Sequence, residues 1–252
     1  MAQFPVQFRP TDQPIFLDLP SEELWSDEPP LESDLHREQI DLLIRLVKYH
    51  WRDRQDFYVS GNLTIFYNEK QLTTQDFRGP DFFLVLDADN RDRRSWVVWK
   101  EQGRYPNLII ELLSDSTANV DRGLKKHLYQ TVFRTPYYFW FHPVTLELAG
   151  FELIQGTYQP IAPNDRGHLW CAPLGLALGV LPEAIDPGIS YPRQRLRLFT
   201  ATGERVQLPE EAERQRAEAE RQRAEAERQR AEAAEARLAE LLAQLESPAD
   251  ES

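Results

Sequence analysis

The feature that most constrains the fold is a single carboxylate inside an apolar run. Residues 108–113 read Leu-Ile-Ile-Glu-Leu-Leu, so Glu111 is the one polar residue among six. A run with apolar residues at both odd and even positions is typical of a strand buried on both faces. A buried carboxylate is costly unless a cation pairs with it or it binds a metal. The sequence therefore predicts that Glu111 is either ion-paired or part of a metal site.

A helix is predicted from about Asn119, which is placed to act as its N-cap. Val120, Leu124 and Leu128 recur every four residues and are expected to form the buried stripe of this helix. Lys125 lies at the edge of that stripe. Lys126 is expected to point nearly opposite, toward solvent.

The same helix carries a second set of residues at a spacing of four. Asp121, Lys125 and Tyr129 are expected to line one face. Lys125 on this face could reach back toward Glu111, and so could Arg122. If no metal binds, either of these two cations could therefore pair with Glu111.

A second carboxylate precedes another strand-like run. Gly79-Pro80-Asp81 leads into residues 82–86, Phe-Phe-Leu-Val-Leu, thirty residues before Glu111. Two carboxylates on adjacent strands suit a hard, oxygen-seeking cation. Such a cation can polarise a phosphoryl oxygen and lower the pKa of a bound water, and a nearby ammonium would stabilise negative charge in the transition state.

These segments, taken in order, resemble the Uma-two family of restriction endonucleases, within the PD-(D/E)XK nuclease superfamily. The resemblance covers roughly residues 14–199 and is carried by Pro80-Asp81, by Glu-Leu-Leu-Ser at 111–114, by Asp-Arg-Gly-Leu-Lys at 121–125 with Tyr129, and by Pro-Tyr-Tyr-Phe-Trp-Phe at 136–141. It implies a metal-dependent DNA endonuclease that hydrolyses phosphodiester bonds. It also implies that Asp81 and Glu111 hold Mg²⁺ or Mn²⁺.

The chain departs from the superfamily at the catalytic lysine. The superfamily places this lysine two residues after the Glu, where this chain has Leu113. The resemblance implies that Lys125 on the following helix has taken over the role, with Asp121 orienting it. Tyr129 would either hydrogen-bond a phosphate or pack in the core.

A first helix is expected from a Ser33 cap to about Trp51. In the superfamily this helix packs beside the metal site and contributes a polar or acidic residue, for which Glu32 and His36 are the candidates. The competing interpretation is that His36 is a satisfied core histidine, because it lies on an apolar stripe.

The order of helix, strands, helix and more strands predicts an α+β fold: a restriction-endonuclease-like mixed sheet flanked by helices. A hairpin is expected around Gly61-Asn62 and a strand meander over residues 137–161. The expected organisation is an extended N-terminal arm at 1–20, a nuclease-like domain at 21–208, a charged helix or coiled coil at 209–246, and a disordered end at 247–252.

The C-terminal segment repeats Ala-Glu-Arg-Gln-Arg-Ala-Glu three times from Ala212. Glu and Arg at spacings of three and four each stabilise a helix by only about 0.2–0.5 kcal/mol, but the pairs are many. The first half offers no apolar stripe, so it is expected to stand away from the body as a solitary helix. Weak dimerisation, or docking of another protein, is expected to depend on the last apolar cluster, Leu238, Leu241, Leu242 and Leu245.

The composition of the chain limits which partners and which cellular location are expected. The chain has 252 residues, a net charge of −12 and one cysteine, and no stretch long enough to span a membrane, so a cytoplasmic protein with no membrane partner is expected. DNA is the expected partner from the resemblance, although an acidic chain lacks the basic surface that is typical of a general nucleic-acid binder.

The alternative function is a nuclease fold that no longer cuts DNA and that acts as an interaction or assembly module through its tail.

Overall fold

The computed structural model describes residues 26, 33–68, 79–114, 116–182 and 194–246, with side chains given as far as Leu242 in the last helix. The expected N-terminal arm, Glu32 and the expected disordered end therefore lie outside the described residues. The first elements in chain order are α1 (Asp34–His50), β1 (Phe57–Ser60), β2 (Ile65–Phe66), β3 (Phe82–Leu86), β4 (Trp96–Val97) and β5 (Leu108–Leu112). The later ones are α3 (Ala118–Val120), η1 (Asp121–Lys125), α4 (Lys126–Leu128), η2 (Tyr129–Phe133), β6 (Tyr137–Phe141), β7 (Leu148–Ile154), β8 (Thr157–Pro160), β9 (Leu169–Cys171), β10 (Leu176–Pro182), β11 (Gln194–Phe199) and α5 (Pro209–Glu246).

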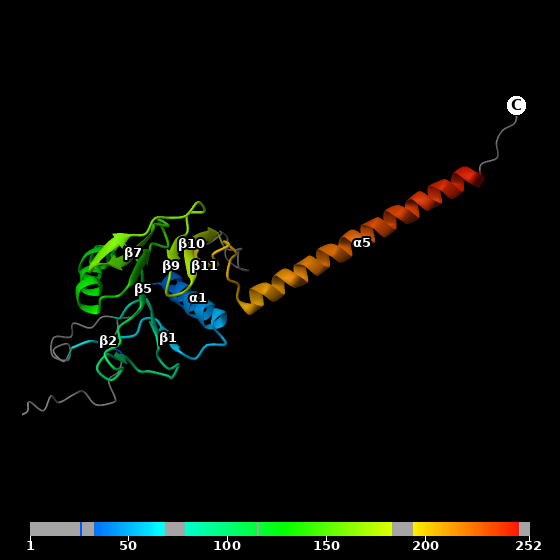
Figure 1. Cartoon of the computed structure of the whole chain (residues 1–252). Coiled ribbons are helices and arrows are strands. Elements are labelled where there is room, and N and C mark those ends of the chain that lie inside the picture. Colours follow the sequence, from blue (N-terminus) through cyan, green and yellow to red (C-terminus); the bar gives the residue numbers. More distant parts are fainter. Residues whose placement is uncertain (1–25, 27–32, 69–78, 115, 183–193, 247–252) are drawn as a thin grey trace, which may run out of the picture.

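The centre of the body is a six-stranded sheet in the order β1-β3-β5-β6-β7-β8 (Figure 1). β5 and β6 are parallel, and the other neighbouring pairs are antiparallel, so the sheet is mixed as predicted. β5 lies between β3 and β6, and all five of its residues are buried. The apolar run at 108–113 therefore forms the buried central strand that it predicts.

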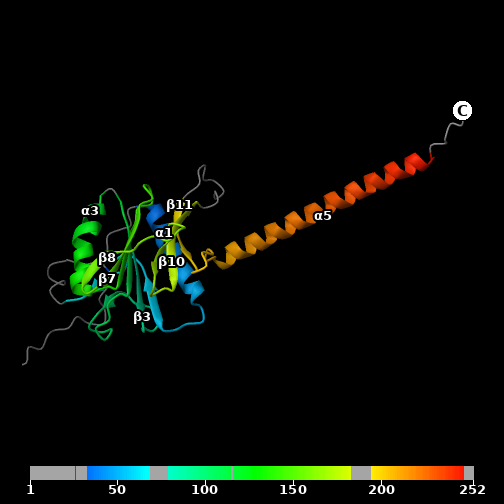
Figure 2. The same ribbon diagram turned by 45° about the horizontal axis from the view of Figure 1, so that its top comes forward.

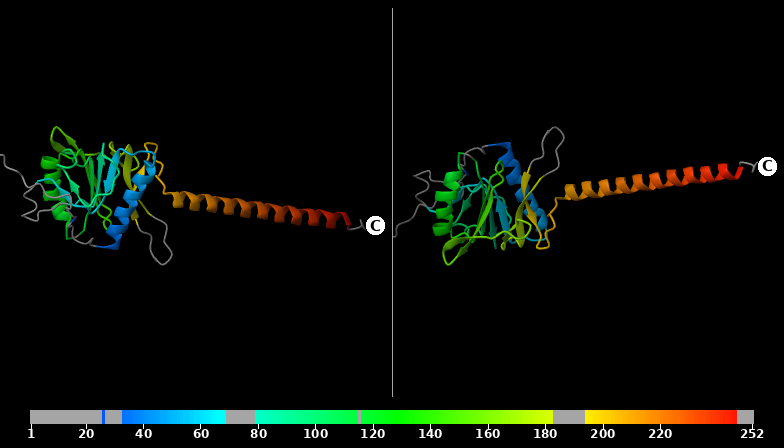
Figure 3. Two further views of the ribbon diagram at one scale, coloured as in Figure 1. Left: turned by 90° about the horizontal axis from the view of Figure 1, so that it is seen from below. Right: turned by 90° about the horizontal axis from the view of Figure 1, so that it is seen from above.

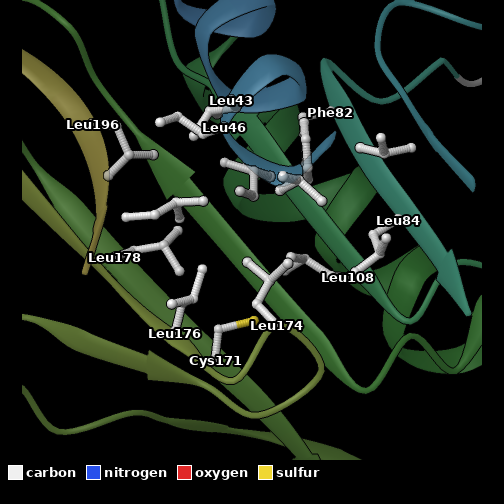
Figure 4. Packing of buried hydrophobic residues seen from close by; sticks show 14 of the residues in the cluster. Leu43, Leu46, Phe82, Leu84, Leu108, Cys171, Leu174, Leu176, Leu178 and Leu196 are labelled. Carbon is white, nitrogen blue, oxygen red and sulfur yellow. The ribbon is translucent and has the colours of Figure 1, made fainter. Parts of the chain in front are cut away.

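One face of this sheet is covered by α1 and by a second sheet, β11-β10-β9. α1 begins after the predicted cap, because the Ser33 side chain accepts a hydrogen bond from the His36 amide. Figure 4 shows this layer, in which leucines of α1 and of the second sheet meet the even-numbered residues of β3 and β5: Leu43, Leu46, Leu178, Leu196, Phe82, Leu84 and Leu108.

The opposite face is covered by residues 118–133, which form one continuous helical segment called here the site helix, and by the short pair β2–β4. The two views of Figure 3 place α1 and the site helix on opposite sides of the sheet. Because side chains alternate along a strand, Ile109 and Leu113 share the face of the site helix. Glu111, between them in register, is turned to that face as well.

The predicted hairpin around Gly61-Asn62 is wrong. β1 pairs with β3 in the large sheet, whereas β2 pairs in parallel with β4 in a separate one. The Gly61-Asn62 turn instead contacts the chain before β3, since the Asn62 amide donates to the Pro80 carbonyl at 3.0 Å. The predicted meander at 137–161 is confirmed as β6, β7 and β8.

α5 is a single helix of 38 residues that projects from the body, as Figure 2 shows. At about 1.5 Å per residue it is about 57 Å long. Every residue from Glu213 to Leu242 is exposed, so the predicted free-standing charged helix is confirmed. Across the described part of the chain, no helix has both the length and the apolar composition that crossing a bilayer requires.

Candidate active site

The site helix differs from the helix that the sequence predicts. It begins at Ala118 with Thr117, not Asn119, as its N-cap, and no cap side chain bonds to its amides. The expected buried stripe is also wrong, because Val120 and Leu124 are exposed, Leu124 by 58%. The buried side chains are instead Asp121, Tyr129 and Phe133.

Two π-helical turns, η1 and η2, account for much of this difference. An α-helix has 3.6 residues per turn, so a stripe of residues spaced by four rotates steadily around it. The wider i→i+5 turns of a π-helix reduce that rotation, and such turns are frequent at functional sites. Asp121, Lys125, Tyr129 and Phe133 therefore stay aligned toward the sheet over the whole segment.

Lys126 is not directed to solvent as predicted. Its Nζ lies 3.4 Å from the centre of the Phe151 ring and 5.3 Å from that of Trp140. Burial lowers the pKa of Lys126. This lysine packs on the aromatic residues of β6 and β7, which leaves Lys125 as the lysine that faces the carboxylates.

Asp81 is positioned by the turn that comes directly before β3. A Cβ on Gly61 would lie 2.3 Å from the Asp81 carbonyl oxygen, so only glycine permits this close approach. The Leu112 amide donates to Asp81 Oδ2 at 2.7 Å and fixes the side chain across the β3–β5 pair.

Glu111 uses both of its carboxylate oxygens, although it is fully buried. The Tyr129 hydroxyl donates to Oε1 at 2.7 Å. The Asp81 amide donates to Oε2 at 3.2 Å, and Lys125 Nζ lies 3.2 Å from the same oxygen. Glu111 is therefore held between β3 and the site helix. Tyr129 is buried as well, which places its hydroxyl out of reach of a phosphate in this arrangement.

Lys125 joins the site helix to the sheet. Besides Glu111, its Nζ contacts Asp121 Oδ1 at 2.8 Å, as an ion pair. The Lys125 side chain is 19% exposed, so it reaches solvent at one edge, while Asp121 is almost completely buried. Arg122, the other cation that could have paired with Glu111, instead pairs with Glu147.

The pKa values of the site follow from placing three acids around one base, with Glu111 and Asp121 buried and Asp81 partly exposed. Burial raises the pKa of Glu111 to about 7, because it outweighs the attraction of Lys125, and Asp81 raises it further. Burial also raises the pKa of Asp81, although Lys125 opposes the shift. The pKa of Asp121 is raised by burial and, in addition, by the negative charge of Glu111. Burial alone would lower the pKa of Lys125, but the carboxylates Glu111, Asp121 and Asp81 together raise it above its ordinary value. The site is therefore a compact network of coupled charges.

The donor set fits one kind of metal ion. Mg²⁺ is usually held by one or two carboxylates and retains several waters. Asp81 and Glu111 provide two carboxylates on neighbouring segments, joined by a hydrogen bond from the Asp81 backbone amide to Glu111 Oε2. Among the described residues, no group of three or more His, Cys, Asp and Glu side chains is placed to hold a metal ion, so an ion here would bind through these two carboxylates and water.

Some contributors to the site are not evident from the sequence. The Tyr138 hydroxyl donates to the Asp121 carbonyl at 2.9 Å, and the Tyr138 ring packs edge-on against Tyr129. The Leu112 amide is a backbone donor, which no side-chain pattern reveals. Tyr138 lies in an aromatic strand whose pattern indicates burial but not the direction of its hydroxyl.

His36, the first-helix candidate that the structure describes, is not brought together with the carboxylates. His36 lies on α1, which packs on the opposite face of the sheet, and its Nδ1 is 2.8 Å from Ser33 Oγ. Within the described residues no contact joins it to Asp81 or Glu111, so its supporting role stays a prediction. The supporting role of Glu32 stays a prediction too, since that residue is not described.

Comparison with known proteins identifies a family and a similar solved structure. A crystal structure from Anabaena variabilis, titled a "putative nuclease belonging to DUF820", aligns over 57% of this chain and 76% of its own, with 9% identity and a TM-score of 0.42. Curated proteins give no match. The model of the Uma2 family, which is the Uma-two family named above and is described as "Putative restriction endonuclease", matches residues 3–182. Since this match covers most of the chain, the protein belongs to the Uma2 family.

Proposed function

We propose that this protein is a metal-dependent DNA endonuclease that hydrolyses phosphodiester bonds. The observation that carries the proposal is the convergence of Asp81, Glu111 and Lys125 on one point between β3, β5 and the site helix. A purely structural role would need only one cation for one carboxylate. Three acids around one lysine, with Glu111 and Asp121 buried, make a costly arrangement, and costly polar arrangements are concentrated at functional sites.

Each residue has a distinct proposed role. Asp81 and Glu111 hold Mg²⁺ or Mn²⁺, which when bound polarises a phosphoryl oxygen and acidifies a water. Lys125 supplies positive charge beside the phosphate and stabilises the negative charge that develops during attack. Asp121 orients Lys125, and the Tyr129 hydroxyl keeps the Glu111 carboxylate turned toward Asp81.

DNA as the substrate is supported by the family and opposed by the overall charge. With a net charge of −12, the protein repels DNA phosphates at long range, and added divalent cations reduce that repulsion. We therefore expect DNA binding to require divalent ions even for variants that do not cut.

The test is cleavage of supercoiled plasmid with Mg²⁺ or Mn²⁺. Wild-type protein should nick or cut the plasmid, and Asp81→Asn, Glu111→Gln and Lys125→Ala should each lose activity by at least about 100-fold. Circular dichroism checks that each variant is folded. Lys126→Ala is the matched control and should retain activity, because Lys126 contacts aromatic rings and not the carboxylates. Equal cutting by wild type and by folded Glu111→Gln would rule out this site as the source of activity.

A second candidate function, an interaction or assembly module that no longer cuts, is favoured by α5. Leu238, Leu241 and Leu242 are exposed near its end at 59%, 44% and 51%. Exposed leucines at helical spacing are typical of a coiled-coil seam. We propose a weak homodimer through this cluster.

The test of this second candidate is sedimentation of the full chain, of a chain ending at Leu208, and of a chain in which the four tail leucines, including Leu245, are serine. The homodimer should be lost in both altered chains. A dimer that survives both changes would be held by the body, and would contradict the tail as its interface. A body that binds no Mg²⁺ or Mn²⁺ would favour this module over the endonuclease.

A further inference from the structure

The two oxygens of Glu111 have different neighbours, and this difference has a chemical consequence. Oε1 receives the Tyr129 hydroxyl from the site helix, whereas Oε2 faces the Asp81 amide. Oε1 is thus held by a hydroxyl on the site helix, whereas Oε2 is turned to the backbone of the residue whose carboxylate would share a divalent ion. We therefore expect an ion shared between Glu111 and Asp81 to bind at Oε2.

Oε2 already has a cation. Lys125 Nζ lies 3.2 Å from it and, on its other side, 2.8 Å from Asp121 Oδ1. An ammonium and a divalent ion cannot occupy the same side of one carboxylate oxygen without strong repulsion. The lysine and the metal therefore compete for Glu111.

We propose that Lys125 is a built-in counter-ion of the metal-free site, which a divalent cation displaces from Glu111 Oε2 while Asp121 retains it. This inference rests on the proposed metal-dependent function and adds to Lys125 a second role, in which it exchanges partners. It accounts for two features together: a lysine paired with two acids on different elements, and a side chain that is still 19% exposed.

Asp121 makes the exchange feasible. It belongs to the same helix as Lys125, four residues earlier, so this ion pair does not depend on the sheet. Once Lys125 leaves Glu111, the remaining pair keeps the ammonium at the solvent edge of the site. A phosphate oxygen entering from solvent would meet the ammonium there.

The test is the affinity for Mn²⁺ alone, measured by titration calorimetry in the full-length protein. Lys125→Met removes the competing charge and keeps the length of the side chain, so it should bind Mn²⁺ about tenfold more tightly than wild type, or better. Lys126→Met is the matched control and should bind like wild type. Equal or weaker binding by folded Lys125→Met would overturn the inference.

A second measurement uses the wild type and does not depend on the folding of a variant. Acetylation of Lys125 is followed by mass spectrometry with and without Mn²⁺, with Lys126 as the internal reference. Displacement from Glu111 should make Lys125 react at least about threefold faster, because a buried ion pair protects an amine from modification. Unchanged or slower acetylation with Mn²⁺ bound would contradict displacement.

The outcomes separate this inference from the proposed function. If Asp81→Asn abolishes Mn²⁺ binding while Lys125→Met leaves it unchanged, the metal site stands and the counter-ion exchange is wrong. If neither wild type nor Lys125→Met binds Mn²⁺, the metal-dependent function and the inference both fail.

Discussion

Two helices of this protein use the same ion-pair chemistry in opposite surroundings. In the site helix, Asp121 and Lys125 are four residues apart and lie against the sheet, with side chains that are 1% and 19% exposed. In α5, Arg228 and Glu232 are also four residues apart, but their side chains are 66% and 67% exposed. The spacing and the charges are alike, so burial decides what each pair contributes.

The difference lies in what happens when one partner is lost. In α5 water replaces the missing partner, so each pair stabilises by only a few tenths of a kcal/mol. In the site helix a lost lysine leaves buried carboxylates without compensation, which costs several kcal/mol. The tail is therefore tolerant of sequence change, and the site is not.

The largest expected effect is on the site helix. Lys125→Met should lower the free energy of unfolding by about 4 kcal/mol in EDTA, because Glu111, Asp121 and Asp81 lose their shared cation. Urea denaturation measures the change. Lys126→Met, whose amine contacts only aromatic rings among the described residues, should cost clearly less. An equal cost for the two variants would show that the buried carboxylates do not depend on Lys125 as their counter-ion.

The pH dependence tests the same site without removing the lysine. The pKa of Glu111 is 4.5 in an unfolded chain and about 7 in the fold, so the folded protein binds the extra proton. The contribution of Glu111 is fully stabilising below pH 4.5 and is lost as pH rises to 7. Relative to Glu111→Gln, wild type should lose up to about 3 kcal/mol over this window, measured by urea denaturation at several pH values. A parallel pH profile for the two proteins would contradict the raised pKa.

An intermediate effect is expected where the tail meets the body. Glu211 Oε2 accepts from the buried Arg197 guanidinium at 2.7 Å and from the Leu208 amide at 2.8 Å. Glu211→Ala should destabilise the body by about 2 kcal/mol, because it removes a charged partner and a helix cap. Glu213→Ala, two residues further and exposed, is the control and should have little effect in the same thermal melt. A large effect at both positions would show that the rest of α5 also supports the body.

The smallest effect is expected within α5. Arg228→Ala breaks contacts with Glu225 and Glu232, yet it should change the free energy of unfolding by less than about 0.5 kcal/mol. Circular dichroism at 222 nm should show a nearly unchanged helix content. A loss of helix over the whole tail would mean that the exposed pairs act as a network.

Much of the site was predictable because its chemistry is local. Glu111 stands out in an apolar run, Asp81 precedes a strand-like run, and Lys125 follows at helical spacing. In the structure Lys125 Nζ pairs with the Glu111 carboxylate, and the Asp81 backbone amide donates to the same carboxylate, while the roles of the three residues stay a prediction. The charged tail was equally predictable, since its repeat contains neither glycine nor proline.

The face of the site helix was not predictable from periodicity. Apolar residues normally face the core, so Val120 and Leu124 were expected inside. The demand for a cation beside Glu111 outweighs their burial, and the π-helical turns that align Asp121 and Lys125 leave no signal in a helical wheel. Long-range contacts were also beyond the sequence, such as the Asn62 amide that bonds to Pro80 instead of closing a hairpin.

The central claim is that Lys125 is the counter-ion that allows the Glu111 carboxylate to be buried beside Asp81 and Asp121. The most direct measurement is a double-mutant cycle in EDTA, with Glu111→Gln, Lys125→Met and the double variant unfolded in urea. We predict a coupling free energy of at least about 2 kcal/mol, against less than about 0.5 kcal/mol for the same cycle at Arg228 and Glu232. A coupling below about 0.5 kcal/mol between Lys125 and Glu111 would contradict the counter-ion role of Lys125.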